Sequence, residues 1–316
     1  MPTRNDVYDT KKCEEITTFQ STEKKVKEVS VAEKYYDLVT DFYEVGWGKS
    51  FHYVPQAKGE TFKQAILRYE MDLAKSLDLK PGMKVLDAGC GVGGPMINIA
   101  KATGCEITGI TICEYQIGKA KKNVAAAGLS DQCNFIHGDF MDTKLPSDSF
   151  DAIFAIESTC HAPSKADCFK EMYRILKPGQ LFGGYEWCVK PNYDKDNPEH
   201  RRVMETIEHT TQTQRIETFE EINQALIEAG FEVLEGQDRC TPGHSWCVPL
   251  YTGLRRKRFV RMLTDLGLSI AEKFKKVPQG SCEVAAYLEE GAAAFIEAEK
   301  LDIFTPNYFF LGRKPL

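Results

Sequence analysis

The sequence predicts an α/β fold built on a mostly parallel, seven-stranded sheet with helices on both faces. Two observations lead to this class. From residue 84 onward, short apolar segments alternate with amphipathic ones, and a glycine-rich turn follows the first apolar segment. Such alternation is typical of parallel sheets whose crossover helices cover both faces. The composition, with 42% hydrophobic and 27% charged residues, is that of an ordinary folded chain and excludes disordered and collagen-like classes.

The first eighty residues divide into two stretches. Residues 1–30 are polar and charged and are expected to form a partly ordered leader. Residues 31–80 form a helical, aromatic segment, with one helix at 31–43 ended by Gly46 and Gly48 and a second at 60–79 that stops before Pro81. Seven of the nineteen residues at 35–53 are aromatic. From composition alone, packing of these aromatic residues on the sheet is favoured over their lining a ligand tunnel.

Residues 81–237 carry the alternation and are expected to form one domain. Its strands are short and mostly apolar, and lie at 84–89, 105–112, 133–140, 150–158, 180–188 and 231–236. Its helices lie at 96–103, 115–128, 168–179 and 218–230, the third stopped by Pro178 and Gly179. Residues 238–316 form the last region, which is mostly helical to residue 300 and ends in a strand at 307–314.

The turn after the first strand has the G-x-G-x-x-G pattern at Gly89, Gly91 and Gly94. Such a turn brings backbone close to a ligand where a strand passes into a helix. A nicotinamide dinucleotide site would carry an acid about 20 residues further on, at the end of the second strand. That strand end has none, and the nearest acid beyond it is Glu114. Asp87 instead precedes the turn, where a carboxylate suits a cationic ligand better than a pyrophosphate.

Longer strings carry a family resemblance. VLDAGCGVGG resembles the first motif of the Rossmann-like S-adenosylmethionine methyltransferases, and PSDSFDAIFA and LKPGQLFGGYEW match two later landmarks in the same order. YEVGWGKSFHY, LDAGCGVGGP, AIESTCHAP and EWCVKPNYDKDNPEH resemble the four signature regions of the sterol 24-C-methyltransferases. LSDQCNFIHGDFM and IFTPNYFFLGRKP also resemble that family, so that the likeness covers roughly residues 33–316. The resemblance implies a Rossmann-like methyltransferase fold that uses S-adenosyl-L-methionine.

The resemblance also implies where the cofactor binds. An acid and glycines hold the methionine part, the end of the second strand lies by the ribose, and an acid after the third strand accepts the adenine amino hydrogen bond. The cofactor-binding residues expected from this comparison are Asp87, Gly89, Cys90, Gly91, Thr111, Asp139 and Phe140. Cys90 is expected to border the cofactor without acting as a nucleophile, because the implied reaction has no covalent step on the enzyme.

The implied reaction is methyl transfer to the side-chain double bond of a sterol, followed by a hydride shift and loss of a proton. The carbocation formed on the way requires aromatic faces, carboxylates, a base and the exclusion of water. The catalytic residues expected are Tyr43, Glu44, His52, Glu157 and His161, with His161 or Tyr43 as the proton acceptor. The substrate-binding residues expected are Tyr36, Phe42, Trp47, Phe51, Glu186 and Trp187.

Three departures from the family pattern stand out. Val45 replaces a usual aromatic residue in a position that borders the sterol pocket, and residues 111–113 replace the usual asparagines after the second strand. Gln180 replaces a glycine in a loop that tolerates the change. Two other functions stay open: a methyltransferase of the same fold acting on another lipid-like or phenolic acceptor such as a tocopherol precursor, and a non-catalytic sterol-binding protein.

Charge and cysteine usage bear on partners and location. The net charge of -6 argues against a nucleic-acid partner. Residues 248–268 place five basic residues among apolar ones, as in helices that lie on anionic membranes, although a solvated helix face is an equal alternative. The eleven cysteines show no C-x-x-C pair, so no metal site is expected. With no signal-peptide or transmembrane pattern, the chain is expected to face the cytosol, associated peripherally with the endoplasmic reticulum. A homo-oligomer is left open.

Overall fold

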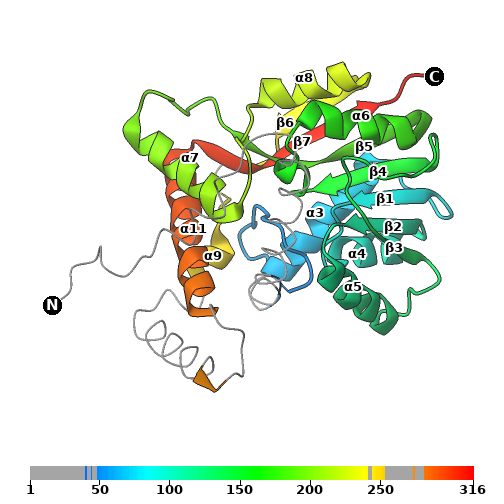
Figure 1. The fold of residues 1–316 in the computed structure, drawn as a ribbon, viewed down its shortest axis with the longest axis horizontal. Helices are drawn as coiled ribbons and strands as arrows, with labels where there is room; N and C mark the ends of the chain where they lie inside the picture. The colour runs from blue at the N-terminus through cyan, green and yellow to red at the C-terminus, as the bar shows by residue number, and fades with distance from the viewer. Residues whose placement is uncertain (1–39, 41–43, 45–47, 241–243, 253–272, 275–280) are drawn as a thin grey trace.

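The structure is a computed structural model that describes residues 40, 44, 48–240, 244–252, 273–274 and 281–316. Its centre is a seven-stranded sheet in the order β3-β2-β1-β4-β5-β7-β6 (Figure 1). The strands are β1 (Lys84–Ala88), β2 (Glu106–Thr111), β3 (Cys133–His137), β4 (Phe150–Ile156), β5 (Leu176–Val189), β6 (Glu232–Asp238) and β7 (Phe304–Arg313). All pairings are parallel except those of β7, which runs antiparallel to β5 and β6. The predicted mostly parallel, seven-stranded sheet is confirmed.

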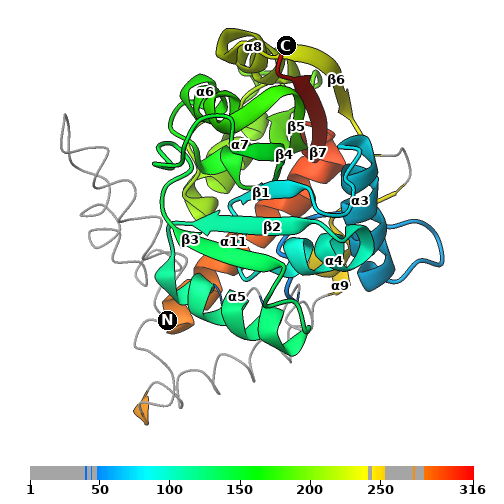
Figure 2. The same cartoon turned by 90° about the vertical axis from the view of Figure 1, so that its right-hand side faces the viewer.

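Helices cover both faces of the sheet, as predicted (Figure 2). One face packs against α3 (Phe62–Ser76), α4 (Gly94–Thr103) and α5 (Glu114–Ala126), and the other against α6 (Lys165–Ile175) and α8 (Phe219–Ala229). Adjacent residues of β1 show the division, because Val85 belongs to the first core and Leu86 to the second. Successive side chains of a strand point to opposite faces, so a mostly apolar strand serves both cores.

A third core lies beyond the carboxyl end of β5, in the lobe at the left of Figure 1. Here α7 (Pro198–Thr211) packs along α11 (Ser281–Leu301), next to the short α9 (Val248–Thr252). Helix α7 was not among the predicted helices. Its signal was present, because Asn197 caps the helix and Pro198 occupies a first-turn position, where the missing amide proton of proline costs nothing.

Several element boundaries differ from those predicted. The helix expected to reach residue 179 ends at Ile175, and β5 already begins at Leu176. Lys177 precedes a proline, which disfavours helical backbone, and the register shift between β4 and β5 accommodates this stretch as a bulge. Strand β4 ends at Ile156 rather than at residue 158, because Glu157 adopts a positive φ of 50°. Strand β7 begins at Phe304, three residues earlier than expected.

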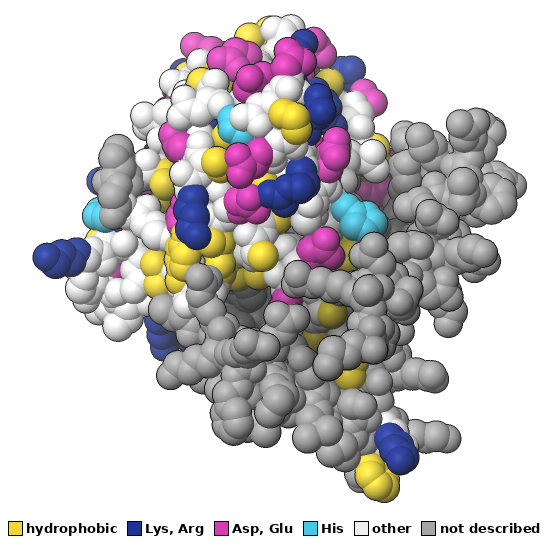
Figure 3. Space-filling view, turned by 90° about the vertical axis from the view of Figure 1, so that its left-hand side faces the viewer, with side chains coloured by type: hydrophobic (Ala, Val, Ile, Leu, Met, Phe, Trp, Pro, Cys, Tyr) yellow, Lys and Arg dark blue, Asp and Glu magenta, His cyan; other side chains and the backbone are white. Residues whose placement is uncertain are grey.

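The last predicted strand is part of the seven-stranded sheet, as expected. Strand β7, which comes from residues 238–316, lies between β5 and β6 and completes it. Apart from Thr40, the predicted helix at 31–43 lies outside the described residues, as does most of the basic stretch at 248–268. On the face drawn in Figure 3, lysine and arginine side chains lie among aspartate and glutamate side chains over its described part. None of the helices in the described ranges is both long and apolar enough to cross a membrane.

Candidate active site

The glycine-rich turn after β1 is shaped by close approaches of other chain segments. Gly89 has a φ of 94°, and a β-carbon there would overlap the side chain of Ser158, which follows β4. A β-carbon on Gly94, the first residue of α4, would overlap the carbonyl oxygen of Lys49. The glycines therefore make room for neighbouring chain segments that approach the turn closely.

Asp87 lies near the carboxyl end of β1, two residues before the turn begins at Gly89. Its side chain is 2% exposed, and Oδ2 has no hydrogen-bond partner among the described residues. Burial raises the pKa of Asp87 well above its usual range, and the nearby Glu70 raises it further. An unpaired carboxylate oxygen in a buried site is costly unless a ligand completes it. The site therefore fits a ligand that brings positive charge to the turn, as the ammonium and sulfonium groups of S-adenosylmethionine would.

In the sheet order, β2 lies next to β1 and β3 lies next to β2, so the carboxyl ends of these three strands form one row. Thr111 is buried, and its hydroxyl donates to Gln116 Oε1 at 3.0 Å and accepts from the Cys113 amide at 3.3 Å. Asp139 follows β3, and its Oδ1 accepts the Met141 amide at 2.8 Å. Phe140 packs against the core on the α6 side of the sheet. The predicted cofactor residues are thus gathered along one edge, where open parallel sheets bind ligands.

Cys90 lies inside the turn and is 3% exposed. Its side chain fills the space where a β-carbon on Gly109 would stand, 2.6 Å from Cys90 Cβ. Burial and the neighbouring Asp87 raise the pKa of the Cys90 thiol well above its usual range. The thiol is therefore protonated at neutral pH, and a protonated thiol is a poor nucleophile. That Cys90 borders the cofactor stays a prediction.

Glu157, immediately after β4, is held by two separate segments. Its Oε1 accepts the Tyr53 amide at 2.8 Å, and its Oε2 accepts the indole Nε1 proton of Trp187 at 2.9 Å. Burial raises the pKa of Glu157 well above its usual range, against the lowering effect of these two hydrogen bonds, and Glu186 adds to the rise. The positive φ of Glu157 costs about 1–3 kcal/mol for a residue other than glycine. The two hydrogen bonds fix the direction of this buried carboxyl group beside the indole ring.

Glu186 has no exposed surface and is enclosed by its own network. It accepts a hydrogen bond from the hydroxyl of Thr159 and one from the Trp187 amide at 2.9 Å. Lys165 Nζ lies 3.2 Å from Glu186 Oε2 and 3.7 Å from Glu217 Oε2. Burial alone would lower the pKa of Lys165, but these two carboxylates outweigh it and raise the pKa. The contacts of Glu186 are those of a residue that orients the end of β5.

His161 ends the short 3-10 helix η1 (Thr159–His161). Its ring centroid is 6.5 Å from that of Trp187. Burial, with a smaller contribution from Lys165, lowers the pKa of His161 to about 4. The imidazole is therefore neutral at pH 7 and able to accept a proton.

The N-terminal segment is described only in part. Glu44 forms an ion pair with Lys119 of α5, and Phe51 lies against the turn at Gly91. His52 is buried and stacks on Tyr69, with ring centroids 5.6 Å apart, and burial lowers its pKa to about 3. The other predicted residues of this segment, which are Tyr36, Phe42, Tyr43 and Trp47, lie outside the described residues.

Two features of the site were missed by the sequence analysis. The first is Glu70, a fully buried carboxyl group on α3. Its signal was its position, because it falls at helical spacing from Ile66, Leu73 and Leu77 on the apolar face. The second is an aromatic cluster whose rings come from five segments, with centroid distances of 5.1–6.4 Å among contacting pairs. Its members are Tyr53, Trp187, Trp246, Phe295 and Phe304.

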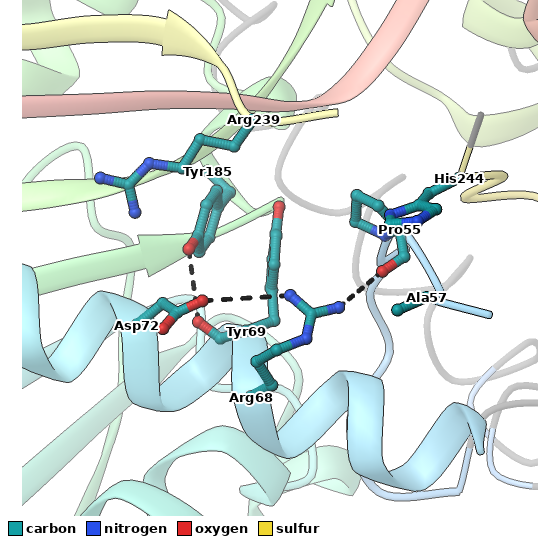
Figure 4. Close-up of a pocket in the computed structure, with 8 residues that line it drawn as sticks. All are labelled: Pro55, Ala57, Arg68, Tyr69, Asp72, Tyr185, Arg239 and His244. Atoms are coloured by element: carbon teal, nitrogen blue, oxygen red, sulfur yellow. Dashed lines mark hydrogen bonds and ion pairs between the residues drawn. The ribbon is translucent and has the colours of Figure 1, made fainter. Parts of the chain in front are cut away.

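A pocket of about 350 Å³ opens between α3, β5 and the chain after β6 (Figure 4). Arg68 donates from Nη2 to the Pro55 carbonyl at 2.7 Å, and the Tyr185 hydroxyl donates to the Tyr69 carbonyl at 3.3 Å. The arginines of the pocket are paired with carboxylates, Arg68 with Glu60 and Arg239 with Glu235.

In the described ranges, no three His, Cys, Asp or Glu side chains converge as they would around a metal ion. The ten cysteines of those ranges are free thiols.

Comparison with known proteins decides the family. A methyltransferase domain model matches residues 86–183, and a sterol methyltransferase C-terminal model matches residues 251–316. The chain is 42% identical to the cycloartenol-C-24-methyltransferase of Arabidopsis thaliana over 300 residues, covering 93% of this chain and 89% of that relative. The chain belongs to the sterol 24-C-methyltransferase family. The sterol 24-C-methyltransferase of Saccharomyces cerevisiae is 40% identical over 296 residues, 89% of this chain and 77% of that one.

Solved structures agree on the fold of this sterol 24-C-methyltransferase family member. A cyclopropane synthase from Mycobacterium tuberculosis superposes with a TM-score of 0.72 at 18% identity, covering 90% of this chain and 98% of that one. A geranyl diphosphate C-methyltransferase from Streptomyces coelicolor gives a TM-score of 0.67 at 17% identity, covering 91% and 97%. At this identity the likeness concerns the fold alone. The predicted Rossmann-like methyltransferase fold and the predicted methyltransferase enzyme class are confirmed.

Proposed function

We propose that this protein transfers the methyl group of S-adenosyl-L-methionine to carbon 24 of a sterol side chain. The observation that carries the proposal is the 42% identity over nearly the whole chain to a cycloartenol-C-24-methyltransferase. The unpaired, buried Asp87 beside the glycine turn supports the same cofactor, since it fits a cationic ligand.

The cofactor would be held along the edge formed by β1, β2 and β3. Asp87 and the turn at Gly89 and Gly91 would take the methionine end, Thr111 would border the ribose, and Asp139 would accept from the adenine amino group. When bound, S-adenosylmethionine supplies an electrophilic methyl group. The chain itself supplies orientation, because these residues project from adjacent strand ends that the sheet holds in place.

The cation formed on the acceptor needs stabilisation without water. Trp187 is 7% exposed and belongs to the aromatic cluster, so its ring offers a desolvated π face worth about 2 kcal/mol or more to a cation. Glu157 is tied to that indole by a hydrogen bond. A cation near this carboxyl group would favour its ionised form, since an opposite charge lowers a carboxyl pKa. Trp187 and Glu157 are thus the pair that would meet the developing charge.

The last step needs a proton acceptor. His161 is neutral at pH 7 and lies near Trp187, so it is our first candidate, with Tyr43 as the second. His52 and Glu44 would act on the N-terminal side, where the first packs on α3 and the second binds α5. Tyr36, Phe42, Trp47 and Phe51 would line the acceptor path, and Glu186 would orient the end of β5.

The test is an assay of the purified protein with labelled S-adenosylmethionine and a panel of sterols with unsaturated side chains. Mass spectrometry is expected to show a product heavier by one CH2 group at the side chain. Asp87→Ala serves as the matched control and should give none. A protein that binds the cofactor but methylates no sterol of the panel would contradict the proposal.

We further propose that the protein works at a cytosol-facing surface of the endoplasmic reticulum, contacting the membrane through residues 248–268. The support is the mixture of basic and apolar residues there and the low water solubility of a sterol. Replacing Arg255, Arg256 and Arg258 by Ser should weaken binding to anionic liposomes at low salt. Unchanged liposome binding would contradict this contact. Sedimentation of the purified protein tests whether it forms a homo-oligomer, which the sequence leaves open.

A further inference from the structure

Asn307 of β7 is a buried amide that none of the proposed reaction steps uses. It has no exposed surface, and its Nδ2 donates to the Tyr53 carbonyl oxygen at 3.3 Å. Its Oδ1 has no hydrogen-bond partner among the described residues. A buried acceptor without a partner lowers the free energy of unfolding, and an apolar side chain would leave no such acceptor. An amide at this place therefore points to a use other than packing.

Strand β7 has a bulge at Asn307. Its register with β5 shifts by one residue there, so Pro306 and Asn307 both lie opposite Trp187. A bulge redirects the side chains of the strand that carries it, and it is one of the few places in a sheet that tolerate proline. The Asn307 amide donates to the Thr305 hydroxyl at 3.1 Å, which holds the bulge in shape. The bulge thus fixes where the Asn307 side chain lies.

The contacts of Asn307 lead to Glu157. The carbonyl group of Tyr53 accepts from Asn307, and the amide of Tyr53 donates to Glu157 Oε1 at 2.8 Å. Glu157 Oε2 accepts the indole proton of Trp187 at 2.9 Å, and Trp187 lies opposite the bulge. The four residues are all buried. A closed ring of contacts therefore joins the chain before α3, the end of β4, β5 and β7, and both oxygens of Glu157 are held within it.

We propose that Asn307 is a positioning residue that sets the direction of the Glu157 carboxyl group by holding the main chain of Tyr53. Asn307 acts through Tyr53 and needs no contact with the cofactor or the acceptor. A charged or dipolar group stabilises a developing cation best when its direction is fixed beforehand, and a displacement of about 1 Å can cost about a hundredfold in rate. The inference rests on the proposed function only for the cation that Glu157 would meet.

The first test reads the hold on Tyr53 in the full chain, without cofactor or sterol. Amide hydrogen exchange is followed by NMR. In wild type, the Tyr53 amide should exchange about a hundredfold more slowly than that of the exposed Lys58. Asn307→Ser shortens the side chain so that it no longer reaches the Tyr53 carbonyl, and it should speed exchange at Tyr53 about tenfold. It should also move the indole proton resonance of Trp187, which is assigned by its absence from Trp187→Phe.

The matched control is Tyr308→Phe, at the next residue of the same strand. It removes the hydrogen bond that the Tyr308 hydroxyl donates to Asn223 Oδ1 at 2.9 Å, on the face of the sheet that packs against α6 and α8. The control should leave the Tyr53 exchange rate and the Trp187 resonance as in wild type. A general loss of stability would instead change both signals in both variants.

The second test is a steady-state assay with labelled S-adenosylmethionine and a sterol with an unsaturated side chain. Asn307→Ser should lower kcat about tenfold and leave the KM for the cofactor unchanged, because it misplaces Glu157 and leaves the ends of β1, β2 and β3 intact. Tyr308→Phe should keep the kcat of wild type. A merely structural role of Asn307 would reduce the amount of folded enzyme and leave its kcat unchanged.

Three outcomes would overturn the proposal. The first is an unchanged Tyr53 exchange rate and an unmoved Trp187 resonance in Asn307→Ser, and the second is an unchanged kcat. The third, which needs no variant and decides the matter if Asn307→Ser does not fold, is a wild-type Tyr53 amide that exchanges as fast as that of Lys58. A protein that shows the expected exchange and resonance changes but methylates no sterol would contradict the proposed function alone.

Discussion

The proposed cofactor edge, at the ends of β1, β2 and β3, and the proposed acceptor side, around Glu157 and Trp187, are built in different ways. At the cofactor edge, Asp87, Thr111 and Asp139 come from three adjacent parallel strands, each just before or after a turn. On the acceptor side, Glu157 and Trp187 meet Tyr53, Trp246 and rings of α11 and β7, which are far apart in sequence. The first site is a property of the sheet, whereas the second exists only after the N-terminal and C-terminal parts have packed on it.

The comparison teaches where each kind of mutation should act. A change at the cofactor edge should affect binding of the cofactor and leave the fold in place, because the strands are held by their own ladder. A change on the acceptor side should affect turnover or stability, because its groups hold separate segments together. Four predictions test this division. The opposite outcome of any of them would contradict the separation between effects on cofactor binding and effects on turnover or stability.

Asp87→Ala should produce the largest effect, a loss of about a thousandfold in affinity for S-adenosylmethionine. Removing the charge that a buried cation would pair with costs about 3–5 kcal/mol. Calorimetric titration measures the affinity, and thermal unfolding should show a fold as stable as wild type. Retained affinity would mean that the buried, unpaired oxygen of Asp87 has another role.

Lys165→Met should destabilise the protein by about 3 kcal/mol, because it leaves Glu186 buried without its cation. Denaturant unfolding measures the change. Lys80→Met is the matched control, since the Lys80 side chain is 65% exposed and its ion pair with Asp78 contributes little. A loss no larger than that of the control would remove Lys165 from the structural core of the acceptor side.

Glu157→Gln should lower turnover about a hundredfold while cofactor affinity stays near wild type, because it removes a carboxyl group that we propose to lie where charge develops. Steady-state assays with a sterol acceptor measure the turnover, and calorimetry measures the affinity. Glu60→Gln, a carboxylate change outside the sheet, serves as the control and should leave turnover unchanged. A loss of cofactor affinity instead of turnover would assign Glu157 to the cofactor edge.

The pH dependence of stability gives the smallest effect. The pKa of His161 is lowered from 6.5 to about 4 by folding, so its stabilising contribution is complete above pH 6.5 and is lost as pH falls towards 4. Lowering the pH from 7 to 5 should reduce the free energy of unfolding by about 2 kcal/mol through this group. His161→Gln should remove that part of the acid sensitivity, whereas the exposed His137→Gln should not. Denaturant curves at the two pH values measure it.

Much of the cofactor edge was predictable from sequence because its signals are local. An apolar strand followed by glycines requires a turn that only glycine fits, and Gly89 and Gly94 occupy positions where a side chain would overlap other backbone or side-chain atoms. Parallel strands then bring their carboxyl ends to one edge whatever the surrounding sequence. The placement of Asp87 and Asp139 follows from these rules.

Other features depended on contacts between distant segments. Whether residue 176 continued a helix or began a strand was decided by pairing with β4. The hydrogen-bond partners of Glu70, which are Ser50 and Asn98, approach it from a loop and from another helix. Its helical spacing signalled burial, but no local pattern named its partners.

By itself, the sequence determined the α/β class, the glycine turn, the acid before it and the family, since turn sterics, strand periodicity and long signature strings are read along the chain. The tertiary structure decided that Glu157 is fixed between the Tyr53 amide and the Trp187 indole, and that Trp187 belongs to a cluster of five rings from five segments. The physical reason is that hydrogen-bond partners and desolvation depend on which segments pack together. Packing arises from the whole core, whereas a turn arises from a few adjacent residues.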